Sequence, residues 1–496
     1  MRVEAEDAVA AGQAVAAASD MAFVQSLGDG FVVLEARGEP SRASTSRLAI
    51  RSAAARSNAG LAAVSLLGEA VMLARVASVE EDFIVQAQAW ATECPDGRCG
   101  PGLWGMDAIR APQAWALVTG AAVAPASSAV LGSVIDTGAQ YEHPELDGQA
   151  VRALGATYLS GVLSGDGADD NGHGTHVTGT MAGRWGGAAG GVAGVAGNAD
   201  VAECKFLGPT GSGYTSDAIL CIKHLAAKGA HFVINNSWAG GGYNMALHYA
   251  IRDYVCARNG LFVAAAGNSG ANVAASGAFP AYYATYAGAE CVLPVAAADS
   301  AGALASFSNF GPAVPLAAPG VGIRSSVWTN ATTAAEAVWS GTSMAAPHVS
   351  GVALLLRNEF PALSAAQIKA VLVSTATARV TPYLARELGG GLLNAEAAYN
   401  AAKAMAAAPA PAPSPSPSPS PSPSPSPSPS PSPSLSAPPP SPSPPPAATP
   451  SPSPLPSPSP SPAPLPCNCR LRAGYCPPRC SGGTCYYKRV PRRGRC

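Results

Sequence analysis

The stretch Ser340-Gly341-Thr342-Ser343-Met344-Ala345-Ala346-Pro347-His348-Val349-Ser350-Gly351 joins a loop of small residues to the start of an apolar helix. The apolar run 352–356 continues it, so we expect a sharp turn into a helix with Ser343 in the first turn. Pro347 fits early in a helix, where its missing N–H costs little. A serine in this place meets unpaired backbone N–H groups and the positive end of the helix dipole, which would stabilise an oxyanion. The alternative interpretation is a serine that only caps the helix.

Two motifs upstream supply an aspartate and a histidine. Asp136 follows the apolar run 130–135, and His173 lies in the glycine-rich segment 171–180, which enters a helix. In an open α/β sheet, ligands bind at the carboxyl ends of the strands. A serine nucleophile needs a base within hydrogen-bond reach and a buried carboxylate that orients the base. The order Asp, His, Ser therefore predicts nucleophilic catalysis by Ser343.

Strands and helices alternate through the middle of the chain, and the strands are continuously apolar. This pattern indicates an α/β fold with a largely parallel sheet flanked by helices. We expect strands at 130–135, 200–207, 232–237 and 261–266, and helices at 217–228, 245–259, 364–375 and 393–407. The chain has 496 residues, of which 48% are hydrophobic and only 12% charged, so one large domain with additional segments is expected.

Three segments resemble the three signatures of the subtilisin family of serine proteases. They are Val134-Ile135-Asp136-Thr137-Gly138, His173-Gly174-Thr175-His176-Val177 and Gly341-Thr342-Ser343-Met344-Ala345-Ala346-Pro347-His348. The resemblance spans roughly residues 94 to 405, and it implies a subtilisin-like peptidase domain at 93–407. It also implies that Asp136 orients the base, that His173 is the general base and then the acid, and that Ser343 attacks the peptide carbonyl. The second histidine of the pair, His176, would be structural.

Two more segments extend the resemblance to substrate binding. Asn268 resembles the asparagine of the oxyanion hole, where its side-chain N–H would act beside the backbone N–H of Ser343. The alternative for this asparagine is a Gly-Asn turn. The run Ser237, Trp238, Ala239 and Gly240 resembles the segment that pairs with an extended substrate backbone, as in β-strand addition. The Trp238 side chain would either shape a subsite or lie in the core.

Residues 1–92 form a separate expected unit with few core residues, and their pattern indicates a small α+β domain. Its expected elements are strands at 30–36 and 70–76, a helix at 41–57 and a closing segment at 79–85. The resemblance implies that this unit is a propeptide, which assists folding and then blocks the active site. Autocleavage is expected between about Val85 and Thr92.

The chain has twelve cysteines, six between Cys94 and Cys291 and six in the last thirty residues. An even count in so short a tail favours a disulfide framework and an oxidising compartment. Zinc is the alternative, although the tail lacks histidine and the paired C-x2-C spacing. Proximity in sequence suggests the pairs Cys94–Cys99, Cys204–Cys221 and Cys256–Cys291, which is one of fifteen arrangements.

No cofactor is expected for the chemistry, since protein groups fill every role. Many family members carry an aspartate that supports a calcium site after a Ser-Asn-Tyr-Gly segment, and Pro315 stands in that place here. Proline offers no carboxylate, and calcium needs several oxygen ligands. A structural calcium ion elsewhere is left open, without assigned ligands.

Residues 408–466 consist of Ser-Pro and Ala-Pro repeats, which favour polyproline II and act as a semi-rigid spacer. Such repeats resemble the hydroxyproline-rich glycoproteins of plant and green-algal walls. The basic, cysteine-rich module 467–496 carries eight Arg or Lys and no acid, whereas 22 basic and 31 acidic residues precede it. This asymmetry predicts an anionic wall or matrix polymer as the partner of the module.

Together these features predict a secreted serine endopeptidase that acts on extracellular or cell-wall proteins. Its partners would be protein or peptide substrates and its own propeptide. Nucleic acid is disfavoured as a partner because disulfides and a wall-like linker indicate the outside of a cell. The sequence contains no apolar run of about 18 residues, the length that predicts a membrane span. The acidic start at Met1 to Asp7 does not resemble a signal peptide. The alternative is a structural or binding protein of the wall with a vestigial protease domain.

Overall fold

The computed structural model describes most of the chain from residue 80 to residue 408 and several short strands outside it. The described residues are 2–3, 21–28, 31–36, 47–48, 76–78, 80–88, 90–91, 102–118, 132–185, 191–330, 333–377, 390–408, 479–481 and 484–486. The chain divides into two compact units, residues 1–412 and residues 413–496.

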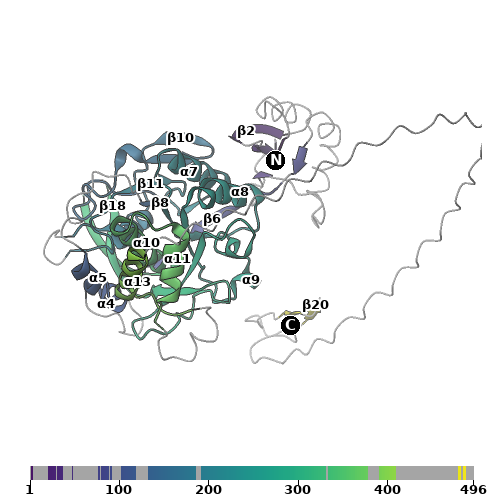
Figure 1. The fold of residues 1–496 in the computed structure, drawn as a ribbon. Helices are drawn as coiled ribbons and strands as arrows, with labels where there is room; N and C mark the ends of the chain where they lie inside the picture. Colours follow the sequence, from purple (N-terminus) through teal and green to yellow (C-terminus); the bar gives the residue numbers. More distant parts are fainter. Residues whose placement is uncertain are drawn as a thin grey trace, which may run out of the picture. The chain divides into compact units, whose positions relative to one another are not determined.

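The centre of the first unit is a sheet of eight strands in the order β10-β9-β11-β8-β13-β15-β16-β17 (Figure 1). The strands are β8 (Gly132–Asp136), β9 (Ala156–Leu159), β10 (Val162–Gly165), β11 (Val201–Lys205), β13 (Val233–Asn236), β15 (Leu261–Ala265), β16 (Val292–Ala298) and β17 (Leu316–Pro319). Neighbouring strands are parallel, except that β10 runs antiparallel to β9 at one edge. The predicted α/β fold with a largely parallel sheet is confirmed.

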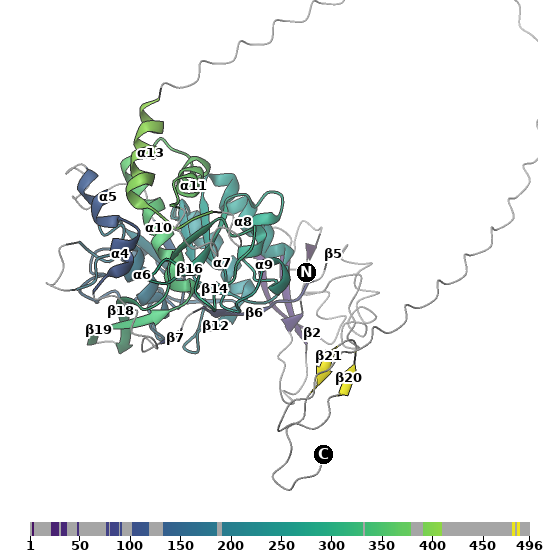
Figure 2. The ribbon, with the colours of Figure 1, turned by 90° about the horizontal axis from the view of Figure 1, so that it is seen from below.

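Helices cover both faces of this sheet (Figure 2). Successive residues of a strand point to opposite faces, and accordingly Val134 and Ile135 of β8 belong to two different apolar clusters. On the Val134 face lie α4 (Trp104–Ala108), α5 (Ala111–Leu117), α6 (His173–Ala182), α10 (Thr342–Glu359), α11 (Ala365–Ser374) and α13 (Ala395–Ala407). On the Ile135 face lie α7 (Thr215–Ala227) and α8 (Met245–Tyr254).

Helix α10 runs through the interior of the unit. All residues from Thr342 to Leu356 are buried, so the helix is enclosed on every side. This explains why its sequence is apolar or small all round instead of amphipathic. The loop expected before this helix is wrong, because Thr333–Ser340 form a paired strand and Gly341 alone separates that strand from α10. Ser343 lies in the first turn of the helix, as the sequence predicts.

Two disulfides fix the covering layer of the sheet. Cys204–Cys221 joins β11 to α7, and Cys256–Cys291 joins the segment after α8 to the residue before β16. Both pairs agree with the predicted pairing. The third predicted pair, Cys94–Cys99, lies outside the described residues.

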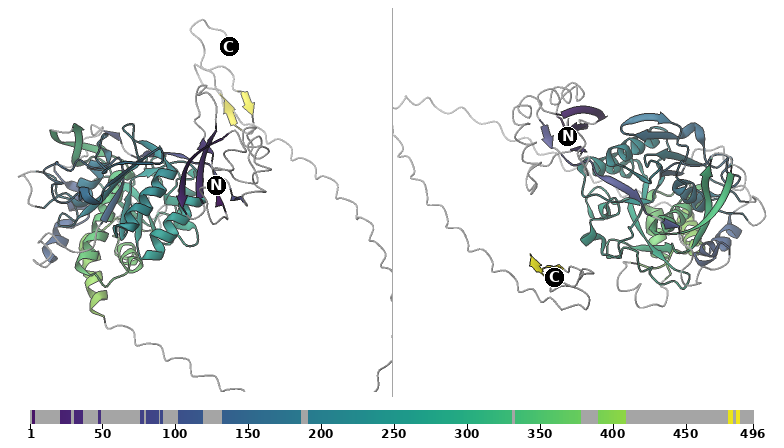
Figure 3. Two further views of the ribbon diagram at one scale, coloured as in Figure 1. Left: turned by 90° about the horizontal axis from the view of Figure 1, so that it is seen from above. Right: turned by 180° about the vertical axis from the view of Figure 1, so that it is seen from behind.

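A small sheet near the N-terminus has the strand order β2-β3-β1-β5, with β4 against β3. The strands are β1 (Arg2–Val3), β2 (Met21–Gly28), β3 (Phe31–Ala36), β4 (Arg47–Leu48) and β5 (Val76–Ser78). Leu27 and Phe31 join the apolar cluster of α7 and α8, and the Phe31 ring meets Tyr249 of α8 edge-on. Strand β2, purple in Figure 3, lies beside the teal helices of this cluster. The helix expected at 41–57 is wrong at residues 47–48, where pairing with β3 outweighs the helix propensity of the alanine-rich sequence. Most of the strand expected at 70–76 lies outside the described residues.

The expectation that residues 79–85 close the N-terminal unit is wrong for the strand that the structure describes there. Instead β6 (Ile84–Ala87) pairs antiparallel with β12 (Ser212–Tyr214) and with β14 (Trp238–Ala239). After it, β7 (Trp90–Ala91) pairs antiparallel with β19 (Thr333–Ser340). An apolar, β-branched run predicts a strand, but it does not identify the strand's partners.

The second unit is described only at a hairpin of β20 (Arg479–Ser481) and β21 (Thr484–Tyr486). The Ser-Pro linker and the remainder of the basic module lie outside the described residues. Among the helices that the structure describes, none has the length and apolarity required to cross a membrane.

Candidate active site

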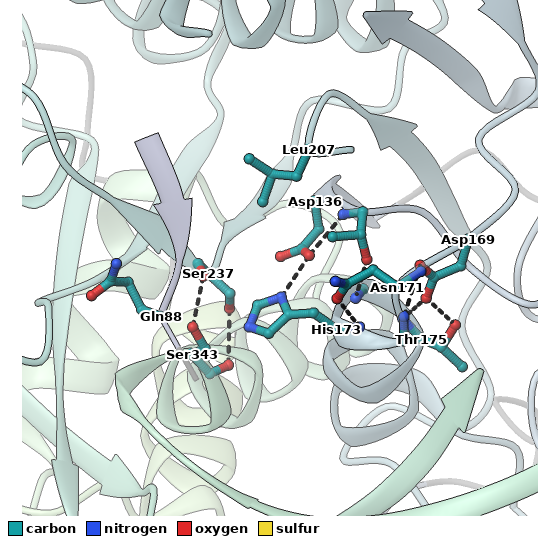
Figure 4. Close-up of polar contacts among 12 residues, drawn as sticks. Gln88, Asp136, Asp169, Asn171, His173, Thr175, Leu207, Ser237 and Ser343 are labelled. Atoms are coloured by element: carbon teal, nitrogen blue, oxygen red, sulfur yellow. Dashed lines mark hydrogen bonds and ion pairs between the residues drawn. The ribbon is translucent and has the colours of Figure 1, made fainter. Parts of the chain in front are cut away.

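Three elements bring the predicted catalytic side chains to the carboxyl edge of the sheet (Figure 4). Asp136 is the last residue of β8, His173 the first residue of α6, and Ser343 the second residue of α10. Gly174 allows α6 to approach β8 this closely, because a Cβ at this position would lie 2.1 Å from the carbonyl oxygen of Gly138. A side chain beside the histidine would therefore push the two elements apart.

The aspartate and the histidine are directly joined. His173 Nδ1 donates to Asp136 Oδ1 at 2.6 Å, and the same oxygen accepts the backbone N–H of Thr137 at 2.7 Å. Both side chains are almost completely buried, which strengthens a hydrogen bond to a carboxylate. His173 Nε2 has no hydrogen-bond partner among the described residues. The imidazole is thus oriented through one nitrogen, and the other remains available for a proton.

The serine hydroxyl does not point to the histidine in this conformation. Ser343 Oγ donates to the carbonyl oxygen of Ser237 at 2.6 Å, and Ser237 Oγ donates to the carbonyl oxygen of Ser343 at 2.9 Å. The hydrogen bond expected between the serine and His173 is therefore absent. To give its proton to Nε2, the Ser343 hydroxyl would have to release the Ser237 carbonyl oxygen.

Asp169, which the motifs above do not include, accepts hydrogen bonds at the start of α6. Its Oδ1 accepts the backbone N–H groups of Asn171 and Gly172 at 2.9 and 3.0 Å. Its Oδ2 accepts the backbone N–H and the hydroxyl of Thr175 at 3.0 and 2.5 Å. Burial raises the pKa of Asp169, and these hydrogen bonds oppose the rise. An aspartate shortly before a helix is a known start signal, so this residue could have been found.

His176, the second histidine of its motif, has the surroundings of a structural residue. It is fully buried, and its Nε2 donates to the carbonyl oxygen of Ile323 at 3.1 Å. Burial lowers the pKa of His176 to about 3. The ring is therefore neutral near pH 7.

Asn268, predicted to form an oxyanion site, lies beside the start of α10 and is hydrogen-bonded to Thr342. The amide orientation of Asn268 is fixed because its Oδ1 accepts both the backbone N–H and the hydroxyl of Thr342, each at 2.9 Å. Its Nδ2 consequently points outward, and it donates to the carbonyl oxygen of Gln88 at 2.6 Å. The backbone N–H of Ser343 donates to the same oxygen at 3.4 Å. The Gln88 carbonyl oxygen therefore accepts from both groups that the sequence predicts as oxyanion donors.

The predicted substrate-binding run contributes mainly its backbone. In the pairing of β6 with β14, Ala87 lies opposite Trp238 and Gln86 opposite Ala239, while the Gln88 N–H donates to the Ser237 carbonyl at 3.1 Å. At Gly240, a Cβ would come within 3.3 Å of the β6 backbone. The Trp238 side chain is fully buried and meets the Phe206 ring edge-on at 5.0 Å, so of its two expected roles it takes the core one.

Two carboxylates of the segment before β6 bind the first turns of helices in the catalytic part. Glu80 Oε2 accepts the backbone N–H of Met245 at 2.5 Å, at the start of α8. Asp82 accepts the backbone N–H and the hydroxyl of Ser216 at 2.8 and 2.6 Å, at the start of α7. Both side chains are buried, and negative charge is favourable at a helix N-terminus. Sequence reasoning did not single out either residue.

Comparison with known proteins agrees with this geometry. Residues 127–391 match the profile of the subtilase family. The chain belongs to the subtilase family. This subtilase is similar to the alkaline protease of Alkalihalobacillus alcalophilus, with 38% identity over 60% of this chain and 69% of that protein. It is similar to subtilisin Savinase of Lederbergia lenta, with 37% identity over 60% of this chain and 97% of that protein.

A solved structure of a cold adapted subtilisin-like serine proteinase aligns with the subtilase over 54% of this chain and 88% of that chain, at 33% identity and a TM-score of 0.46. From its family and its relatives, the subtilase is a subtilisin-like serine endopeptidase. Among the described residues, no group of three or more His, Cys, Asp or Glu side chains is arranged to hold a metal ion.

Proposed function

We propose that this subtilase is a secreted endopeptidase that hydrolyses peptide bonds through Asp136, His173 and Ser343. The Ser343 hydroxyl gives its proton to His173 Nε2 as its oxygen attacks the carbonyl carbon. The buried carboxylate of Asp136 orients the imidazole and stabilises the cation that forms. No cofactor is needed for these steps, because protein groups fill each role.

The negative charge of the tetrahedral intermediate would fall between Asn268 Nδ2 and the backbone N–H of Ser343. Both are preorganised donors, since Thr342 fixes the amide and α10 fixes the backbone. When the C–N bond breaks, His173 gives its proton to the leaving amine, and an acyl-enzyme remains on Ser343. Water, deprotonated by His173, then releases the acid product.

The observation that carries this proposal is the position of the Gln88 carbonyl oxygen, which accepts hydrogen bonds from Asn268 and from Ser343 N. The strands before and after it pair with the catalytic part, β6 with β12 and β14, and β7 with β19. A peptide held on both sides with its carbonyl in the oxyanion site has the geometry of a substrate. We therefore propose that the enzyme cleaves its own Gln88–Ala89 bond.

Residues 1–88 would then be the propeptide. After cleavage, the segment 80–88 would remain bound through β6 pairing and through the carboxylates of Glu80 and Asp82. Because this segment fills the substrate strand position, the bound product would inhibit the enzyme until it dissociates or is degraded.

The test is expression of the full chain, its Ser343→Ala variant and a control variant, Ser374→Ala, which alters an exposed serine at the end of α11. The parent and the control should yield a new N-terminus that begins Ala89-Trp90-Ala91, measured by intact mass and N-terminal sequencing. The Ser343→Ala chain should stay intact. If all three chains fold but none is cut, the alternative of a vestigial protease domain in a wall protein is favoured. A cut at another bond would contradict the assignment of Gln88.

We further propose that the enzyme acts outside the cell, on proteins of a wall or matrix. The disulfides Cys204–Cys221 and Cys256–Cys291 support an oxidising compartment. The basic module 467–496, with eight Arg or Lys and no acid, would bind an anionic polymer at the end of the linker 408–466. Tethering of this kind raises the local concentration of enzyme near its substrates.

A further inference from the structure

We propose that Trp339 is a positioning residue that couples the leaving part of the substrate to the imidazole of His173. The leaving part is the peptide after the cleaved bond, which residues 90–91 represent here. This inference rests on the proposed function, and it adds a residue that neither the family motifs nor the sequence pattern indicated. Two independent contacts of Trp339 carry it, one through its side chain and one through its backbone.

The Trp339 ring covers the two histidines of α6. It is stacked on His176 with ring centroids 4.9 Å apart and the planes 1° from parallel. It is also stacked on His173, at 6.1 Å and 22°. The two histidines are three residues apart and so share one face of the helix. One half-buried indole is therefore stacked on both rings, and we expect it to restrict rotation of the His173 imidazole.

The hairpin that carries Trp339 is fixed to the same helix. This hairpin consists of β18 (Ile323–Asn330) and β19. Ser325 Oγ donates to the carbonyl oxygen of His176 at 2.8 Å, and His176 donates to Ile323 as described above. At Gly172, just before α6, a Cβ would lie 2.8 Å from the carbonyl oxygen of Trp328 and 3.6 Å from the Trp339 ring. The hairpin and the start of α6 thus form one closely packed body.

The backbone of Trp339 meets the leaving part of the peptide. In the pairing of β7 with β19, Ala91 lies opposite Trp339 and Trp90 opposite Ser340. These residues begin two positions after Gln88, whose carbonyl lies in the oxyanion site. Strand β19, which pairs with the leaving peptide, therefore also carries the Trp339 ring that is stacked on the His173 imidazole.

This arrangement matters at the step in which the C–N bond breaks. The imidazolium formed from His173 must then give its proton to the leaving amine. The indole of Trp339, stacked on this ring with the centroids 6.1 Å apart, would keep the imidazole oriented toward that amine. Pairing of the leaving peptide with β19 would hold the leaving nitrogen close to the His173 imidazolium, which donates the proton.

The test compares two substrates that share the residues of Ile84 to Gln88 before the cleaved bond. One continues with the residues of 89–92, and the other ends in a 4-nitroanilide, which has no backbone to pair with β19 and a weakly basic leaving group. The processed parent, Trp339→Leu, Trp339→Phe and the control Trp328→Leu are compared by kcat/KM from pH 5 to 9. Trp328 is a half-buried tryptophan of the same hairpin, and the described ring contacts join it to neither histidine.

We expect Trp339→Leu to lose about tenfold in kcat/KM on the extended peptide and no more than about threefold on the anilide, from the strength of one stacked pair. Trp339→Phe should restore most of the activity on the extended peptide, and Trp328→Leu should lose little on either substrate.

Equal losses of kcat/KM on the two substrates would overturn the proposal, because a merely structural residue affects both alike. The same pattern in Trp328→Leu would also overturn it. The proposed function is tested separately. The parent should hydrolyse the substrates, and the Ser343→Ala variant should not. Failure of that function and failure of the coupling are thus distinguishable.

Discussion

The carboxylate of Asp82 should decide how long the cleaved N-terminal segment stays bound. Asp82 is buried, and it accepts two hydrogen bonds from Ser216 in the first turn of α7. Replacement by alanine removes both bonds and a negative charge at the helix N-terminus. When the cleaved segment and the enzyme are apart, water hydrates the Asp82 position and the N-terminus of α7. The lost hydrogen bonds therefore weaken only the complex.

The magnitude follows from the two bonds. Hydrogen bonds to a charged group contribute about 1.5–3 kcal/mol each, but the helix N-terminus is rehydrated when the carboxylate is removed, so we expect a net loss of about 2–3 kcal/mol. This corresponds to a dissociation constant about 30- to 150-fold higher for the cleaved segment.

The assay uses the full chain after it has cut its own Gln88–Ala89 bond, which intact mass verifies for each variant. Serial dilution releases the bound segment, and the recovery of peptidase activity with dilution gives the dissociation constant. Glu81→Ala is the matched control, because the Glu81 side chain is exposed and only its carbonyl oxygen accepts a bond, from Asn244. Equal dissociation constants for Asp82→Ala and Glu81→Ala would refute the argument from the helix contact.

Three further predictions concern the oxyanion site, acid stability and the basic module. Asn268→Ala should lower kcat about 10²–10³-fold with little change in KM, a magnitude measured in subtilisin itself; an unchanged kcat in steady-state assays would contradict the role. Burial lowers the pKa of His176 to about 3 and that of His348 to about 4, both below 6.5. Below pH 6.5 the unfolded chain therefore binds protons that the folded chain does not, and the free energy of unfolding falls by about 1.4 kcal/mol per pH unit for each histidine down to about pH 4. Urea unfolding of the Ser343→Ala chain should show a smaller fall when His348→Gln is added, and an identical slope would speak against it. Removal of residues 467–496 should abolish salt-sensitive retention on an anionic polysaccharide without changing peptide hydrolysis, and retention of the truncated chain would exclude the module as the anchor.

Local sequence patterns determined much of the framework. The apolar runs predicted strands β8, β11, β13 and β15 within a few residues, because a strand buried on both faces needs apolar side chains at every position. Asp136, His173 and Ser343 could be identified because each lies in a short contiguous motif whose residue types are tied to local geometry, such as the small residues that precede α10. The sequence also indicated Asn268, since its neighbours form a strand that ends at the same edge.

Tertiary structure decided which distant groups meet. Gln88 and Asn268 are 180 residues apart, and nothing local to either shows that the carbonyl of one accepts from the amide of the other. The path of the chain and the strand register likewise decide that Trp339 is stacked on His173 and that Asp82 binds α7. Propensity and burial patterns state that a residue pairs or is buried, whereas its partner is fixed only when the whole sheet assembles. Short sequence motifs therefore indicate candidate catalytic residues, whereas the fold brings together groups such as Gln88 and Asn268 that no local pattern connects.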